Sequence, residues 1–319
     1  MLTKKDFESK NEVRWCPGCG DHAVLTTLQK TLPELGVDKD NTLIVAGIGC
    51  SSRLPFYIDV NGFHTVHGRA FPIATGAILA RPELTTWVVT GDGDGFSIGL
   101  SHLIHLLRRN VNVKVLMLNN RIYGLTKGQY SPTSKMGQLS RTSNNGVEDK
   151  ELNPIEMALT AGATFVARAI DTEAKSLKEI ITKANKHKGA AFIEILQNCN
   201  VYNDGVFAQI KDKKNQANSI LRVEEGKPLI YGVEQEKGLV FNQETFSIET
   251  GHAQDSINYR NTKDDFLAKA IAKLDYPDFP VAIGVFKNTI TKIFNEESKE
   301  QESEALLAKA LDKQMTWKV

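Results

Sequence analysis

Four short runs of apolar residues, rich in β-branched side chains, are each followed by glycine or polar residues. They cover residues 43–46, 86–90, 113–118 and 190–196. Runs of this length without polar alternation are typical of strands buried on both faces of a parallel sheet. The pattern therefore predicts an α/β fold with a doubly wound, mostly parallel sheet.

The stretches between these runs have helical periodicity. Residues 25–32, 72–80, 96–110, 172–187 and a segment opening at Pro154 fit helices, and Pro near a helix start is favourable. Residues 131–150 are polar without an apolar period, which predicts a surface loop and a lid. Towards the C-terminus, residues 222–250 fit short strands, and 263–274 and 291–315 fit charged amphipathic helices.

Composition excludes some classes of protein. The chain has 319 residues, 41% hydrophobic and 24% charged, which is enough for a large α/β core. The net charge of +1 and the absence of a dense basic tract argue against nucleic-acid binding. We find neither a signal-type apolar segment near the N-terminus nor 18 consecutive apolar residues, so we expect a cytoplasmic protein that does not span a membrane.

Two of the predicted strands end in polar groups that suit a diphosphate and a metal ion. Residues 91–95 read Gly-Asp-Gly-Asp-Gly, and the next strand ends at Asn119-Asn120. Asp92 and Asn120 offer the oxygen ligands that Mg²⁺ prefers, and Gly91 and Gly93 let the backbone approach a diphosphate closely. Because parallel strands end at one crevice, these groups should meet there.

Two other interpretations compete for this stretch. Gly-Asp-Gly alone is an ordinary turn sequence. A nicotinamide-binding fingerprint would need a third glycine at position 96, which is Phe. The added strand ending in Asn120 resembles the thiamine diphosphate motif instead, and that resemblance implies three metal ligands: Asp92, Asn120 and the main-chain oxygen of Ile122.

The chain has four cysteines, Cys16, Cys19, Cys50 and Cys199. Cys16 and Cys19 form a Cys-x-x-Cys turn, which alone fits a redox dithiol, half a zinc site or half an iron-sulfur site. Cys50 and Cys199 follow predicted strands, near the diphosphate crevice. A lone buried cysteine most often only packs as a small apolar residue. Four thiolates together suit tetrahedral zinc or a cubane cluster, and a neighbouring thiamine-type cofactor favours the cluster, which could accept its electrons.

Five motifs together resemble the β subunit of 2-oxoacid:ferredoxin oxidoreductases, and most of all the 2-oxoglutarate branch. The motifs are residues 16–22 (CPGCGDH), 47–53 (GIGCSSR), 63–69 (FHTVHGR), 91–96 (GDGDGF) and 120–134 (NRIYGLTKGQYSPTS). The match covers roughly residues 11–210. It implies a thiamine diphosphate and iron-sulfur domain over residues 1–210, and leaves 211–319 as a C-terminal extension.

The resemblance also assigns residues to the site. It implies a [4Fe-4S] cluster on the four cysteines and Mg²⁺ with thiamine diphosphate. The residues implied to line the cofactor, meet its diphosphate or close over it are Ile48, Gly49, Cys50, Ser51, His67, Gly91, Gly93, Asp94, Gly124 and Leu125. For His67, the alternative is a histidine held in a turn.

The implied reaction is oxidative decarboxylation of a 2-oxoacid to acyl-coenzyme A and CO₂, with electrons leaving to ferredoxin. An α subunit, and further small subunits, would complete the enzyme. Arg53 would bind the second carboxylate of 2-oxoglutarate and Leu125 would line the substrate pocket; alternatively, Arg53 pairs with an acid at a subunit interface. Three alternative functions remain open here: a related enzyme using pyruvate, a carboligase or decarboxylase without a redox role, and a zinc-stabilised scaffold.

Overall fold

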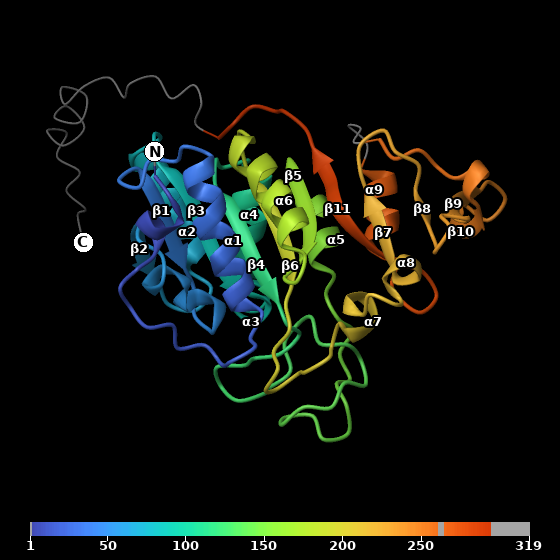
Figure 1. The fold of residues 1–319 in the computed structure, drawn as a ribbon, viewed down its shortest axis with the longest axis horizontal. Coiled ribbons are helices and arrows are strands. Elements are labelled where there is room, and N and C mark those ends of the chain that lie inside the picture. The colour runs from blue at the N-terminus through green and yellow to red at the C-terminus, as the bar shows by residue number, and fades with distance from the viewer. Residues whose placement is uncertain (1, 261–264, 295–319) are drawn as a thin grey trace, which may run out of the picture.

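An eight-stranded sheet forms the centre of the protein (Figure 1). The computed structural model describes residues 2–260 and 265–294. The strand order is β2-β1-β3-β4-β6-β5-β11-β7. All neighbouring strands are parallel except β11, which is antiparallel to β5. The strands are β1 (Thr42–Ala46), β2 (Asn61–His64), β3 (Thr85–Gly91), β4 (Lys114–Asn119), β5 (Phe165–Ile170), β6 (Ala191–Leu196), β7 (Ile220–Val223) and β11 (Val281–Asn288). This confirms the predicted α/β class.

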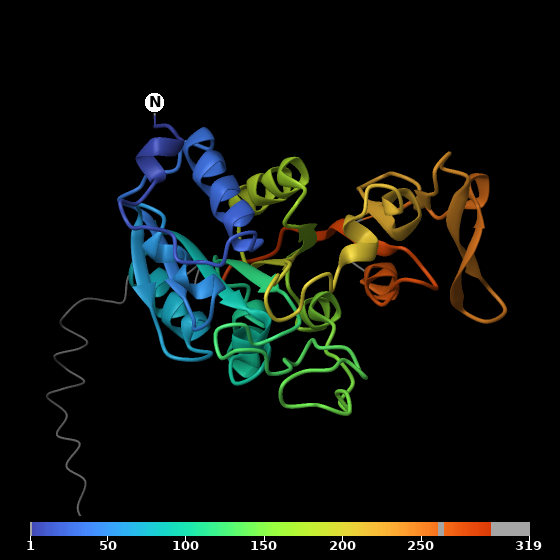
Figure 2. The ribbon, with the colours of Figure 1, turned by 60° about the horizontal axis from the view of Figure 1, so that its bottom comes forward.

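Helices cover both faces of the sheet, which is therefore doubly wound (Figure 2). One face packs against α1 (Asp21–Glu34) and α6 (Ala174–Lys186). The other packs against α2 (Ala70–Ala80), α4 (Leu100–Arg108), α5 (Pro154–Thr160) and α9 (Phe266–Ala272). Successive residues of the central strands alternate between the two cores, as they must when a sheet is buried on both sides.

The helix expected over residues 96–110 is interrupted. A short helix α3 (Asp92–Phe96) contains the Gly-Asp-Gly-Asp residues, and α4 begins only at Leu100. The reason is a close backbone approach: a Cβ at Gly68 would lie 2.6 Å from the Cα of Gly99. The segment before α2 therefore contacts the segment between α3 and α4 closely. The glycine-rich stretch was predicted to be a turn before a single helix, but most of it forms the short helix α3.

Part of the chain beyond residue 210 continues the central sheet. Strands β7 and β11 pair with each other there, and β11 also pairs with β5. The remaining strands, β8 (Ile230–Tyr231), β9 (Lys237–Asn242) and β10 (Ser247–His252), form a separate antiparallel sheet at one end of the molecule (Figure 1). The domain division at residue 210 stays a prediction.

The remaining short elements join these parts. They are the 3₁₀ helices η1 (Lys4–Phe7), η2 (Ser51–Phe56) and η3 (Ala253–Asp255), and the helices α7 (Ala208–Lys211) and α8 (Gln216–Ser219). The helix expected over 291–315 is absent from residues 291–294, and the rest of that range lies outside the described residues. Among the described helices, none has the length and apolar content needed to cross a bilayer.

The long connections gather at one edge of the sheet. Strands β1, β3, β4 and β6 all end there, and the segments after β4 and β6 lie side by side below the sheet in Figure 1. Residues 131–150 belong to this region and contain no helix or strand of the sheets. The predicted surface loop is partly buried, because Ser131, Thr133 and Ser134 at its start are buried.

Candidate functional site

A cavity of about 80 Å³ lies at the carboxyl edge of β1, β3 and β4. Its lining contains every residue predicted to contact the cofactor, together with the three predicted metal ligands. These residues are Ile48, Gly49, Cys50, Ser51, His67, Gly91, Asp92, Gly93, Asp94, Asn120, Ile122, Gly124 and Leu125. Strand order explains why segments far apart in sequence meet here, since β1, β3 and β4 are consecutive neighbours.

Asp92 is the buried carboxylate of this cavity, with an exposed fraction of 2%. Its Oδ2 accepts hydrogen bonds from Ser131 Oγ at 2.5 Å and Thr133 Oγ1 at 2.7 Å. Burial raises the pKa of the Asp92 carboxyl, and these two hydrogen bonds oppose the shift. Within the described residues, Asp92 forms no ion pair with a positively charged side chain. A bound cation would therefore supply the positive charge that neutralises its carboxylate.

The two asparagines at the end of β4 have different surroundings. Asn120 lines the cavity, and its Oδ1 accepts the N–H of Ile122 at 3.1 Å. Asn119 is buried behind it, where Oδ1 accepts from Thr133 Oγ1 at 2.9 Å and Nδ2 donates to Glu194 at 2.7 Å. Asn120 is therefore the one positioned to offer an oxygen to a metal, as the motif implies.

Gly93 is packed beneath an aromatic ring. The Tyr123 hydroxyl donates to the Gly93 carbonyl at 2.7 Å, and a Cβ on Gly93 would lie 2.7 Å from Cδ1 of that ring. Only glycine allows this approach. Tyr123 thereby joins the loop after β4 to helix α3, and it forms part of the cavity wall.

Asp94 fixes the segment that carries His67. Its buried carboxylate accepts hydrogen bonds from the N–H of Gly68 and from Thr90 Oγ1, both at 2.8 Å. Nδ1 of His67 lies 3.1 Å from the same carboxylate, while the histidine side chain remains half exposed. This arrangement leaves Nε2 of His67 as the ring nitrogen available to a ligand. The side chain of Asp94 holds this segment in place, and Asp94 is also one of the residues that line the cavity.

The four cysteines gather beside this cavity. A Cβ on Gly124 would lie 3.5 Å from Sγ of Cys50 and 3.6 Å from Sγ of Cys199, so both thiols face the same cavity residue. Gln197 Nε2 donates to Cys19 Sγ at 3.3 Å. All four are free thiols, and Cys16 is the exposed one. Three segments of the chain, which contain Cys16 and Cys19, Cys50, and Cys199, thus contribute to one cysteine group.

Burial, and to a lesser extent nearby acidic groups, disfavour the anionic form of Cys19 and Cys50. Burial, with smaller contributions from Asp21 and from Cys199 and Cys16, raises the pKa of Cys50 to about 11. The pKa of Cys19 is raised as well, again chiefly by burial. Thiolates here would require a compensating cationic group, as a metal cluster provides. Among residues 2–260 and 265–294, no three His, Cys, Asp or Glu side chains surround a position suited to a single metal ion.

Of the two residues predicted to contact a substrate, Leu125 lines the cavity and Arg53 does not. Leu125 is 50% exposed. Arg53, in η2, donates one hydrogen bond to the main-chain oxygen of Arg14 at 3.3 Å and forms no ion pair within the described part of the chain. The positive charge of Arg53 slightly opposes the rise in the pKa of Cys50 that burial causes.

Sequence reasoning missed Ser131, Thr133 and Tyr123. The first two lie in a polar stretch without periodicity, where no pattern marks a residue as buried. All three fall within residues 120–134, the longest of the motifs. Their place within this motif could have marked them as candidates for the site, but the motif did not indicate what their side chains do.

Comparison with known proteins identifies the domain that contains this cavity. Residues 47–195 match the family model for the C-terminal thiamine pyrophosphate-binding domain of thiamine pyrophosphate enzymes. Over 304 residues, the chain is 43% identical to the 2-oxoglutarate oxidoreductase subunit KorB of Mycobacterium tuberculosis, covering 93% of this chain and 81% of the relative. It is 49% identical over 190 residues to subunit beta of 2-oxoacid:ferredoxin oxidoreductase 1 from Aeropyrum pernix, covering 60% of each chain.

The chain belongs to the 2-oxoacid:ferredoxin oxidoreductase β-subunit family. A solved structure agrees. It is a 2-oxoglutarate:ferredoxin oxidoreductase from Magnetococcus marinus with 2-oxoglutarate, coenzyme A and succinyl-CoA bound. Its match covers 99% of this chain and 93% of that chain, with 31% identity and a TM-score of 0.76.

Membership in the 2-oxoacid:ferredoxin oxidoreductase family decides between the alternative functions. The chain is a subunit of an oxidoreductase, so the carboligase and the zinc-stabilised scaffold are set aside. The thiamine pyrophosphate-binding domain accounts for the cavity at the carboxyl edge of β1, β3 and β4. A β subunit implies an α subunit as its partner.

Proposed function

We propose that this β subunit works in the oxidative decarboxylation of 2-oxoglutarate to an acyl-coenzyme A and CO₂, with ferredoxin as electron acceptor. The cofactors would be thiamine diphosphate, Mg²⁺ and a [4Fe-4S] cluster. The observation that carries the proposal is the shared wall between two sites. Cys50 lines the cofactor cavity, and Gly124 of the same wall lies against the thiols of both Cys50 and Cys199.

Each cofactor has donors of suitable chemistry. Asp92, Asn120 and the carbonyl of Ile122 are hard oxygen donors that would hold Mg²⁺, which commonly takes its remaining ligands from diphosphate and water. The four cysteines match the usual ligation of a [4Fe-4S] cluster. When bound, thiamine diphosphate would supply the electron sink that permits loss of CO₂, and a cluster held by the cysteines would provide an acceptor for the electrons.

The residues of this chain would hold and orient the reacting groups. Gly91 and Gly93 present main-chain groups to the diphosphate, and Asp94 holds His67 with its Nε2 available at the cavity. The half-exposed side chain of Leu125 would exclude water from one side of the substrate. The Tyr123 hydroxyl holds the main chain of Gly93, and the hydroxyls of Ser131 and Thr133 hold the carboxylate of Asp92.

Arg53 is proposed to select 2-oxoglutarate. Its planar guanidinium can bind the distal carboxylate with two parallel hydrogen bonds, and pyruvate has no such group. The names of the relatives, which refer to 2-oxoglutarate, favour this role over pairing at a subunit interface.

The specificity of an Arg53→Ala variant tests the proposal. The specificity constant kcat/KM of the purified complex for 2-oxoglutarate should fall by about tenfold or more, because a charge-assisted contact is lost, whereas kcat/KM for pyruvate should change little. Arg14→Ala is the matched control, since it removes an equal charge from the residue whose main-chain oxygen Arg53 contacts. A parallel fall for both substrates, or a wild-type preference for pyruvate, would contradict the assignment.

A further inference from the structure

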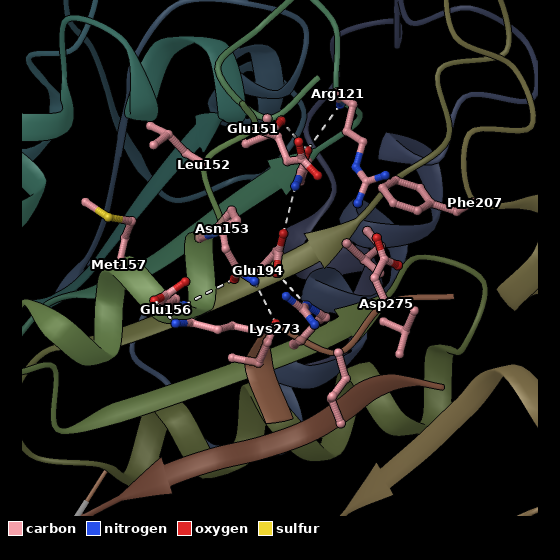
Figure 3. A pocket seen from close by; sticks show the side chains of 18 of the residues that line it. Arg121, Glu151, Leu152, Asn153, Glu156, Met157, Glu194, Phe207, Lys273 and Asp275 are labelled. Carbon is pink, nitrogen blue, oxygen red and sulfur yellow. Dashed lines mark hydrogen bonds and ion pairs between the residues drawn. The ribbon is translucent and has the colours of Figure 1, made fainter. Parts of the chain in front are cut away.

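A second cavity, of about 460 Å³, lies across β4 from the cofactor cavity (Figure 3). The ends of β4, β5 and β6, helix α5 and the segments around residues 207–210 and 272–275 surround it. Thr133 separates the two cavities: it lines the larger one and donates to Asp92 of the smaller one. None of the residues assigned to the cofactors, the metal or the substrate lines this second cavity.

Arg121 is the unusual residue of this cavity. Its guanidinium stacks over the ring of Phe207 at 4.9 Å, and Figure 3 shows the two side by side. The guanidinium donates no hydrogen bond and forms no ion pair to any residue that the structure describes, and its Nε is buried without a partner. Burial lowers the pKa of Arg121. A guanidinium with five donors is costly to enclose unless an anion accepts them.

The backbone of Arg121 is held in a strained conformation. Its φ of +56° lies in the left-handed region, which a residue with a side chain seldom adopts. Its N–H donates to Asn119 Oδ1 at 3.1 Å, and its carbonyl accepts from Ser134 Oγ at 2.6 Å and Gln138 Nε2 at 3.1 Å. Such strain persists where surrounding contacts enforce it, and it is concentrated at functional sites.

Most carboxylates around the cavity already have a cation. Glu194 pairs with Arg168 at 2.6 Å, Asp275 with Lys135 at 2.6 Å, and Glu156 with Lys273 at 2.9 Å. Glu194, Asp275 and Glu151 are near enough to favour the charged form of Arg121 without forming an ion pair with it. Of these three, Glu151 is the one without a cation of its own in the described residues, and its neighbour Lys150 also lines the cavity.

The rest of the wall is largely aliphatic. Apolar side chains lining the cavity are Leu152, Met157, Leu196, Ile210, Leu274 and Val281. The cavity thus combines paired charges, the unpaired guanidinium of Arg121 and these apolar side chains, which suits a ligand with one anionic end and an apolar body. Stacking on Phe207 leaves the edge of the guanidinium open, where a planar carboxylate can accept two parallel hydrogen bonds.

We propose that this cavity is a second binding site, for a small aliphatic carboxylate whose anionic end is held by Arg121. The site is separate from the one that would take the 2-oxoacid, because neither Arg53 nor Leu125 lines this cavity. Occupancy would place a ligand against Thr133, one hydrogen bond away from Asp92.

Butyrate is a suitable probe, because it has neither a keto group to react nor a second carboxylate for Arg53. Its binding to the purified complex is measured by saturation-transfer NMR on the butyrate methyl group, with inorganic phosphate as a second probe. Wild type should bind butyrate saturably and phosphate more weakly, since phosphate lacks an aliphatic body. Arg121→Gln should weaken butyrate binding by about tenfold or more, and Arg121→Lys by less.

Two control variants establish whether the effect on butyrate binding is specific to Arg121. Arg109→Gln removes another arginine that stacks on a phenylalanine, Phe294 at 5.7 Å, but on the surface, and should leave butyrate binding unchanged. Glu151→Gln should preserve or strengthen binding; weaker binding would identify Glu151 as a necessary partner of Arg121 and overturn the proposal. Absence of saturable binding by the complex, or equal binding by wild type and Arg121→Gln, would also overturn it. Urea unfolding of each variant establishes that it is folded.

Discussion

Asp92 combines deep burial with hydrogen-bond donors that carry no charge. Ser131 and Thr133 orient its carboxylate, yet neither neutralises it. A carboxylate in this setting gains most from a divalent cation, because it is already desolvated in the folded protein and the attraction is weakly screened. The cysteines form a separate group, so the two sites should respond independently to substitution.

Asp92→Ala and Cys199→Ala test this independence as a reciprocal pair. Asp92→Ala should weaken metal-dependent binding of thiamine diphosphate by more than about tenfold while leaving the iron content of the complex unchanged. Cys199→Ala should reduce iron content and electron transfer more than cofactor retention. Iron and thiamine diphosphate are measured in each anaerobically purified complex. Equal iron loss in both variants would mean that the two sites form as one unit or that Asp92 is only structural.

Single residues could be assigned from sequence where a strand end or a motif marked them. Asp92, Asn120 and Cys50 follow apolar runs, which predict their place at one edge of the sheet. The burial of Ser131 and Thr133 could not be predicted in this way, because tertiary contacts rather than a periodic pattern determine the conformation of residues 121–134. Arg121 escaped notice for the same reason, since neither its positive φ nor its stacking on Phe207 has a local sequence signal.

At the scale of elements, helix α3 depends on close packing with the loop after β4. The Tyr123 ring packs against Gly93, and its hydroxyl donates to the Gly93 carbonyl. These two contacts hold α3, the helix that contains Asp92 and Asp94, against the loop after β4. The expectation of one helix over 96–110 failed because the contact of Gly68 with Gly99 comes from a segment far earlier in the chain. Helical periodicity alone does not reveal such a contact.

Gly93→Ala should destabilise the protein and disturb the cofactor site. The added methyl group would collide with the Tyr123 ring, and overpacking of this kind costs about 1 to 3 kcal/mol in the free energy of unfolding. Gly76→Ala, in α2, is the matched control: a Cβ there meets no atom within 4 Å, and alanine in a helix should stabilise by about 0.5 to 1 kcal/mol. Urea unfolding measures both. A Gly93→Ala variant as stable as wild type would show that the ring moves aside without cost.

At the scale of the molecule, the cofactor cavity is open and partly apolar at its rim. Leu125, which lines the cavity, is half exposed. No glutamate lines the cavity in the described part of the chain, whereas thiamine diphosphate needs a carboxylic acid at its aminopyrimidine to become reactive. The family resemblance implies that this glutamate belongs to another domain.

The isolated chain should therefore be nearly inactive. Without the acid from a partner subunit, its rate of 2-oxoacid decarboxylation should be at least about a hundredfold below that of the purified complex, both with thiamine diphosphate and Mg²⁺ present. Adding the separately purified α subunit should restore activity. Comparable rates for the isolated chain and the complex would contradict this prediction.

The extent of the central sheet was the part of the architecture least accessible from sequence. Buried runs such as 86–90 and 113–118 identify strands on local evidence, and their order follows from the usual behaviour of parallel sheets. The pairing of β7 with β11 joins segments separated by more than fifty residues, and no local pattern specifies it. For that reason the sequence predicted only a C-terminal extension after residue 210, although β7 and β11 of this region belong to the central sheet.

The position of β11 also has a consequence for the newly made chain. In the described sheet, β7 is an edge strand whose only neighbour is β11, which lies later in the sequence. A ribosome releases β7 first, so this strand has no place in the sheet until residues 281–288 have also emerged. The wall that Leu274 and Val281 give to the second cavity is completed equally late. The edge with the cofactor residues can thus form earlier in synthesis, while the Arg121 cavity closes only after residues 281–288 have emerged.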